Sequence, residues 1–196
     1  MEIRNTKVFA LEDSIRRSGI PKSLDIDKLD LNLKRAERLA TCKSGTGHDC
    51  FLKGIIVQAD IKATIKWWVQ WERYHFSDII SSQSTMHKLK DMHLDESYSK
   101  WVDTRVIEIM KELQHNYNEN PNKANFYQMV YTNPTGMELT VGITTSYLQE
   151  KTVYKQRKNH PLQEEWGYYI DWIKNLPESQ LIIGNSSELN YVTKEG

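Results

Sequence analysis

The residues with the greatest capacity for chemistry lie between positions 70 and 84, in the stretch QWERYHFSDIISSQS. Arg73 supplies a guanidinium, whose planar fork matches a phosphate group, and His75 supplies an imidazole, which carries a positive charge when protonated. The serines and the glutamine that follow can donate hydrogen bonds to phosphate oxygens without adding charge. The stretch therefore predicts either an anion site beside an aromatic wall or an ordinary polar loop after a helix.

A second basic segment, YKQRKNH, contains Arg157. Its cations could supply another fixed positive charge to a phosphate, or they could form the solvated face of a helix. His48, which follows a glycine and precedes an apolar run, is likewise either a ligand-facing residue or a solvated loop histidine.

Metal and covalent chemistry are not indicated. The stretch CKSGTGHDC places His48 between Cys42 and Cys50, but a fourth ligand is missing and the spacing matches no common zinc motif. Buried or half-buried free thiols are the interpretation we prefer. No activated nucleophile, dinucleotide glycine fingerprint or phosphate P-loop stands out, so no catalytic residue is assigned.

Composition limits the remaining classes of function. The chain has 196 residues, and 26 Lys and Arg residues balance 26 Asp and Glu residues. A neutral chain does not suggest binding to duplex nucleic acid or to a membrane surface, and no apolar run is long enough to span a membrane. The N-terminus lacks the apolar segment of a signal peptide, so we expect a cytoplasmic protein.

The first half of the chain shows alternating helical and strand patterns. Apolar spacing predicts a helix over about 26–41, and the SGTG segment ends it. A buried strand is expected over 55–59, followed by a tryptophan-rich helix over 61–75. The serine-rich residues 77–85 should then form a loop, because serines compete for backbone hydrogen bonds. The tryptophans are expected in the core or at a subunit contact.

The second half is predicted to be mostly helical. Helices are expected over 97–117, with Trp101 in the apolar stripe, and over 123–133. A strand over 137–146 leads into a helix over 147–157, and a last amphipathic helix covers 164–177. The fold class is therefore α+β, with a small, mostly antiparallel sheet and about six helices. We expect an N-terminal extension over 1–25, a single domain over 26–183 and a flexible tail over 184–196.

Three blocks of this sequence resemble the flavin-dependent thymidylate synthases, in the same order and at similar spacing. GHDCFLKGIIVQADI, at 47–61, is similar to the family segment GHESxLEHxxFxFxI. Residues 70–87 stand where that family carries RHRxxSxNExSxR. TTSYLQEKTVYKQRKNH, at 144–160, stands where it carries a helix that ends in Leu-Arg.

The central motif is eroded in this chain. Arg73 matches the first arginine, Tyr74 stands for the histidine and His75 for the second arginine. With one residue inserted, Ser84 matches the last serine, and Met86 replaces the final arginine. Two fixed cations that could fork onto a phosphate are therefore missing.

The resemblance implies a pyrimidine nucleotide such as dUMP as ligand, FAD as candidate cofactor, no metal, and a homotetramer whose sites are shared between subunits. The nucleotide-binding residues that it implies are Arg73, Ser82, Gln83, Ser84 and Arg157. The cofactor-binding residues that it implies are His48, Gln70 and His75. Flavin would perform the difficult step and the protein would position it. Three functions remain open: a thymidylate synthase-like enzyme, an inactive nucleotide-binding relative, and a structural or interaction protein.

Overall fold

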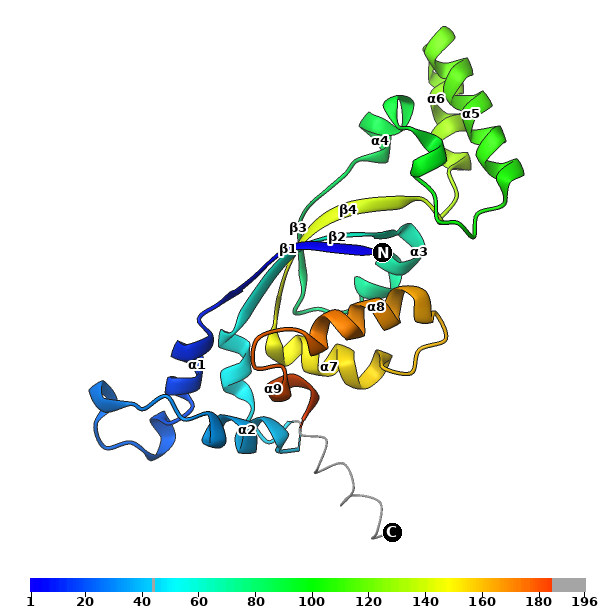
Figure 1. Cartoon of the computed structure of the whole chain (residues 1–196). Helices are drawn as coiled ribbons and strands as arrows, with labels where there is room; N and C mark the ends of the chain where they lie inside the picture. Colours follow the sequence, from blue (N-terminus) through cyan, green and yellow to red (C-terminus); the bar gives the residue numbers. More distant parts are fainter. Residues whose placement is uncertain (44, 185–196) are drawn as a thin grey trace. The chain divides into compact units, whose positions relative to one another are not determined.

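The computed structural model describes residues 1–43 and 45–184. It contains a four-stranded antiparallel sheet in the order β1-β2-β4-β3 (Figure 1). The strands are β1 (Glu2–Phe9), β2 (Ile56–Thr64), β3 (Asp78–Ser82) and β4 (Glu138–Ser146). This architecture confirms the predicted α+β class.

The chain divides into two compact units, and each strand continues from one unit into the other. Unit 1 comprises residues 1–4, 60–73 and 79–143, and unit 2 comprises residues 5–59, 74–78 and 144–196. The description below treats each unit separately.

Unit 2 contains most of the candidate site. Its helices include α1 (Leu11–Arg17), α2 (Leu33–Thr41), α7 (Tyr147–Arg157), α8 (Gln163–Lys174) and α9 (Gln180–Ile183). Short 3-10 helices cover 20–22, 26–28 and, as η3, Cys50–Gly54. The fully buried side chains on these elements form its core, among them Ile15, Leu52, Val153, Trp166, Tyr169 and Ile173.

Unit 1 contains α3 (Ile65–Trp71), α4 (Thr85–Lys88), α5 (Thr104–Glu119) and α6 (Lys123–Thr132). Two further 3-10 helices cover 89–91 and 94–96. Helices α5 and α6 lie side by side (Figure 1). They pack over a cluster of buried side chains: Leu89, Leu94, Tyr98, Met110, Met129 and Met137. Such a cluster stabilises the unit by removing apolar surface from water.

The predicted helix over 61–75 is wrong at both ends. Residues 61–64 continue β2, where burial alternates along the strand, and the helix runs only from Ile65 to Trp71. Thr64 marks the boundary, because its hydroxyl accepts a hydrogen bond from the Trp67 amide at 3.1 Å as a helix N-cap. Ile61 fits a period of either two or about four residues, so periodicity alone could not place this boundary.

Two other segments also differ from the prediction. The expected loop over 77–85 contains β3, whose five residues are all exposed, so no apolar alternation marked it as a strand. The helix predicted over 97–117 begins only at Thr104, since Asp103 caps it by accepting from the Arg105 amide at 2.9 Å. Trp101 is consequently 74% exposed instead of contributing to the apolar stripe.

The first predicted helix is shorter than expected. The segment 26–41 divides into the 3-10 turn at 26–28 and α2, because Asn32 caps α2 through the Arg35 amide at 2.9 Å. The remaining helices, α6, α7 and α8, and the strand β4 agree with the prediction within a few residues. The residues expected to be an N-terminal extension contain β1 and α1, and 185–196 of the expected tail lie outside the described residues.

Candidate functional site

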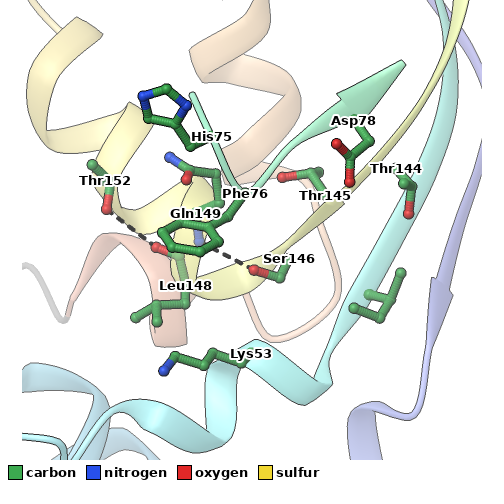
Figure 2. Close-up of a pocket in the computed structure, with 11 residues that line it drawn as sticks. Lys53, His75, Phe76, Asp78, Thr144, Thr145, Ser146, Leu148, Gln149 and Thr152 are labelled. Atoms are coloured by element: carbon green, nitrogen blue, oxygen red, sulfur yellow. Dashed lines mark hydrogen bonds between the residues drawn. The ribbon is translucent and has the colours of Figure 1, made fainter. Parts of the chain in front are cut away.

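A pocket of about 490 Å³ in unit 2 contains His75, and we call it the His75 pocket (Figure 2). It is bordered by the turn before β3, by the end of β4 and by the start of α7. Its lining residues are Lys53, Ile56, His75, Phe76, Asp78, Thr144, Thr145, Ser146, Leu148, Gln149 and Thr152. A volume of this size suits a small-molecule ligand, and the hydroxyl, amide, carboxylate and imidazole groups could orient one.

The polar wall of this pocket exists because β4 passes directly into α7. Ser146 ends the strand and caps the helix, its hydroxyl accepting from the Gln149 amide at 3.3 Å (Figure 2). The next amide, of Tyr147, donates to the carbonyl of Ile55 at 3.0 Å and so fixes the start of α7 against β2. A strand that becomes a helix without a loop holds its last side chains rigidly.

The turn at 74–78 contributes His75, Phe76 and Asp78 to the lining of the pocket. Tyr74 and Ser77 are buried, while His75 and Phe76 between them are exposed and line the pocket. The Ser77 amide donates to the Tyr74 carbonyl at 3.0 Å, and the Ser77 hydroxyl lies 2.8 Å from the Thr145 hydroxyl. The backbone hydrogen bond closes the turn, and the hydroxyl contact ties it to β4, so His75 is held at the exposed side of the turn.

Behind the wall lies a fully buried carboxyl group, that of Glu150. Its Oε1 accepts hydrogen bonds from the Thr145 hydroxyl at 2.8 Å and the Tyr169 hydroxyl at 3.0 Å. Its Oε2 is buried and has no hydrogen-bond partner in the part of the chain that the structure describes. Burial raises the pKa of Glu150 to about 7, and the two hydroxyl donors only partly oppose this effect.

Arg157, at the end of α7, is held by an aromatic pair. Its Nε donates to the Tyr74 hydroxyl at 2.7 Å, and that hydroxyl also donates to Gln156 at 3.2 Å. The guanidinium lies over the Trp166 ring, 4.7 Å from its centroid, in cation–π geometry. Neither Nη1 nor Nη2 forms a hydrogen bond or ion pair with any other residue in the described ranges, so both are available to a ligand.

His48 lies outside the His75 pocket. It is exposed and lines a different cavity of unit 2, of about 490 Å³, formed by 17–22, α2 and 47–51. Unit 2 therefore does not bring its three predicted residues together: His48 and His75 line different pockets, and Arg157 lines neither of them. Of these, only His75 lines the pocket described above.

The other predicted residues belong to unit 1. Gln70 is half-buried on α3, and Arg73 is exposed just after that helix, with no hydrogen bond or ion pair to the described residues of its own unit. Ser82 ends β3. Gln83 pairs with Thr140, whose amide donates to Gln83 Oε1 at 2.8 Å, and Ser84 caps α4 by accepting from the His87 amide at 3.3 Å. The Ser84 hydroxyl hydrogen remains available as a neutral donor.

The tryptophans of α3 are core residues, as expected. Trp67, Trp68 and Trp71 are at most 5% exposed and pack ring against ring within unit 1, with centroid separations of 4.8–6.3 Å. They form a structural cluster.

Both cysteines have free thiols, Cys42 half-buried as expected and Cys50 exposed, which corrects the expected burial of Cys50. Over 1–43 and 45–184, no three His, Cys, Asp or Glu side chains gather as metal ligands would. None of the helices in these ranges is long and apolar enough to cross a membrane.

Comparison with known proteins identifies the fold. No protein-family model and no curated protein matches this sequence. Among solved structures, the flavin-dependent thymidylate synthase ThyX of Helicobacter pylori, complexed with FAD and dUMP, is 14% identical; its TM-score is 0.71, over 92% of this chain and 96% of that one. The chain has the fold of flavin-dependent thymidylate synthases.

Two further structures agree. A second ThyX structure from Helicobacter pylori, also with FAD and dUMP, has a TM-score of 0.69 at 14% identity over 92% of this chain and 95% of that chain. The UMP/dUMP methylase PolB from Streptomyces cacaoi, bound with 5-Br dUMP, has a TM-score of 0.65 at 11% identity over 88% and 89% of the two chains. The structural similarity establishes the ThyX-like fold. At identities this low it establishes nothing about function, which has to be argued from the residues of this chain.

Sequence reasoning missed Thr145 and Glu150. Both lie in the block TTSYLQEKTVYKQR, in which the sequence singles out only Arg157 as a candidate site residue. One signal could have revealed Glu150. It shares a helix face with the apolar and aromatic residues Tyr147, Val153 and Tyr154, and an acidic residue on such a face is unusual.

Proposed function

We propose that this chain binds a pyrimidine nucleotide of the dUMP type, with FAD as its candidate cofactor, as a divergent flavin-dependent thymidylate synthase-like protein. The observation that carries the proposal is the held guanidinium of Arg157. Tyr74 and Trp166 fix one edge and one face of the guanidinium, and its Nη groups remain available. A preoriented guanidinium with free N–H donors suits a phosphate group. The fold likeness to proteins solved with dUMP or 5-Br dUMP supports the same ligand class.

Unit 1 contributes the second group of nucleotide candidates. Arg73 has no partner in its unit, and Ser82, Gln83 and Ser84 follow it with hydroxyl and amide groups. Neutral donors of this kind can complete the hydrogen bonds of a phosphate that Arg73 neutralises. Met86 stands where the family motif has its last arginine, so Arg73 is the fixed cation of this group.

The His75 pocket fits a flavin ring in chemical character. Its walls combine apolar surface from Ile56, Phe76 and Leu148 with hydrogen-bonding groups from Thr145 and Gln149. A flat heteroaromatic ring needs this combination of apolar faces and a polar edge. His75, from this pocket, and Gln70 and His48, from elsewhere, remain the proposed cofactor residues. When bound, FAD would supply hydride transfer.

A nucleotide-binding relative that has lost the reaction is the second candidate. The observation that favours it is Tyr74, which replaces the histidine of the family motif and is only 6% exposed. Its ring packs edge-on against Trp166 at 6.3 Å, so this position now serves packing and the orientation of Arg157. A purely structural or interaction role is the third candidate.

Two measurements on the purified protein separate these candidates. Mass spectrometry of released small molecules and the absorption spectrum report bound flavin, which the enzyme proposal expects. Thermal stabilisation by dUMP of a colourless protein supports the inactive relative, because a ligand that binds only the folded state raises the melting temperature. If neither FAD nor dUMP binds or stabilises the chain, nucleotide binding is refuted.

A further inference from the structure

Three hydroxyl groups and one carboxyl group form a continuous hydrogen-bonded chain behind the wall of the His75 pocket. Thr145 donates to Glu150 Oε1 at 2.8 Å, and Tyr169 donates to the same oxygen at 3.0 Å. Because Thr145 gives its single hydroxyl hydrogen to Glu150, the Ser77 hydroxyl, 2.8 Å away, must be the donor to Thr145. All four side chains belong to unit 2, and Thr145 lines the pocket (Figure 2). The chain therefore connects a buried carboxyl group to the surface of the pocket.

The partners of Glu150 decide where its proton is held when the group is neutral. Oε2 is buried and has no hydrogen-bond partner in the described part of the chain. A hydrogen on Oε2 would be a buried donor without an acceptor, which is costlier than an acceptor without a donor. A hydrogen on Oε1 can be donated to Thr145, whose hydroxyl oxygen lies closer than the phenol oxygen of Tyr169. Protonated Glu150 is therefore expected to donate from Oε1 to Thr145.

Protonation of Glu150 redirects the Thr145 hydroxyl. A hydroxyl group has one hydrogen and two acceptor lone pairs. When Glu150 is ionised, Thr145 accepts from Ser77 and points its hydrogen at the carboxylate. When Glu150 is protonated, Ser77 and Glu150 occupy both lone pairs, and the Thr145 hydrogen has to find another acceptor. Because Thr145 lines the His75 pocket, a ligand in that pocket can supply the acceptor.

The surroundings of Glu150 favour a change of protonation near neutral pH. Burial raises its pKa to about 7, and the hydrogen bonds from Thr145 and then Tyr169 partly oppose this effect. Tyr169 is the titratable group that contacts Glu150 from α8. Lys151, the next residue of α7, is paired with Asp49 at 2.6 Å. The other charged or titratable groups near this wall belong to the pocket lining: Lys53, His75 and Asp78.

We propose that Glu150 is a positioning residue of the His75 pocket, whose protonated form makes Thr145 donate a hydrogen bond to an acceptor atom of the bound ligand. The ligand class is a planar heteroaromatic ring with a carbonyl oxygen at this wall, because a carbonyl can only accept from Thr145. The proton that Glu150 holds in the bound state is taken from the solvent, so the ligand binds with proton uptake. This role rests on the proposed function in one respect, namely that the pocket takes the flavin ring of FAD.

The test is calorimetric titration of the full chain with FAD in pairs of buffers that differ in ionisation enthalpy, HEPES and Tris at about pH 8 and MES and Bis-Tris at about pH 6. The dependence of the binding heat on the buffer gives the number of protons taken up. Near pH 8 free Glu150 is mostly ionised, so binding should take up roughly half to one proton. Near pH 6 Glu150 already holds its proton, so its contribution should be close to zero. FAD affinity should accordingly fall as the pH rises above about 7, by at most about tenfold per pH unit.

Two variants identify the source of the proton uptake. Glu150→Gln cannot ionise and Thr145→Val has no hydroxyl group, so each should abolish the difference in proton uptake between the two pH values. Thr152→Val is the matched control, because Thr152 lines the same pocket but donates to the Leu148 carbonyl at 3.3 Å and does not contact Glu150. This variant should keep the wild-type difference. The titratable groups of the lining are unchanged in all three variants, so their contributions cancel in the comparison.

Two outcomes would overturn the proposal while leaving FAD as cofactor: binding of FAD to the wild type with the same proton uptake at both pH values, or a wild-type difference that persists in Glu150→Gln and Thr145→Val. Failure of FAD to bind the wild type would refute FAD as cofactor and this role of Glu150 with it. Melting temperatures verify that each variant is folded. The two substitutions lie on different elements, β4 and α7, so one unstable variant leaves the other informative.

Discussion

Replacing Glu150 with glutamine should change how the stability of the protein depends on pH. Glu150 is fully buried, and its pKa is raised from an ordinary 4.5 to about 7. Because each pH unit corresponds to about 1.4 kcal/mol, this difference amounts to about 3 kcal/mol between the folded and unfolded states. Glutamine keeps the Oε1 acceptor for Thr145 and Tyr169 but cannot ionise.

The direction of the pH effect on stability depends on whether the folded or the unfolded state retains the proton of Glu150. Below pH 4.5, both states carry protonated Glu150 and the residue imposes no penalty. Between pH 4.5 and about 7, the unfolded chain loses the proton while the folded protein retains it, so this contribution to stability falls. Above about pH 7 the full penalty remains, since the folded protein must bury a carboxylate.

The assay is urea unfolding of wild type and Glu150→Gln at several pH values. The variant should gain about 3 kcal/mol relative to wild type between pH 4.5 and 8, and the gain should level off near the top of this range. Exposed Glu112, on α5, provides the control: Glu112→Gln should show no comparable gain. Parallel stability curves for wild type and Glu150→Gln would show that Glu150 titrates normally and would refute the argument.

Three further predictions concern the site, the core and the assembly. Tyr74→Phe keeps the ring against Trp166 but removes the hydroxyl that holds Arg157, so dUMP affinity measured by calorimetry should fall several-fold; unchanged affinity would contradict this role. Trp71→Ala should lower the free energy of unfolding by about 3–5 kcal/mol in urea, because the side chain is fully buried, and a loss below about 1 kcal/mol would be inconsistent with its packing. Light scattering at micromolar concentration should give a homotetramer, as the family resemblance implies, and a monomer would contradict it.

The elements that could be predicted were those whose apolar residues follow a single spacing, either helical or alternating. Helix α8 and strand β4 could be located because Trp166, Ile170 and Ile173 repeat at helical spacing and Val141 and Ile143 alternate. β3 was missed because all its residues are exposed, so pairing in the sheet, and not burial, makes it a strand.

The candidate site was predictable only where a motif marked it. The motif drew attention to Arg73 and His75, and a separate basic segment to Arg157; the structure adds contacts that neither pattern could contain. Tyr74 holds Arg157 although the two residues are 83 apart in sequence, and Ser77 meets Thr145 across 68 residues. Side chains brought together over such distances leave no local spacing to detect.

The most direct test of the central claim is calorimetric titration of wild type, Arg73→Ala and Arg157→Ala with dUMP and with deoxyuridine. If these arginines bind the nucleotide phosphate, each variant should lose roughly 10- to 150-fold in dUMP affinity, which corresponds to about 1.5–3 kcal/mol for one charged hydrogen bond. The wild type should bind deoxyuridine much more weakly than dUMP, and the melting temperatures should change little. If both variants bind dUMP as the wild type does, or if deoxyuridine binds as well as dUMP, the proposed phosphate site is wrong.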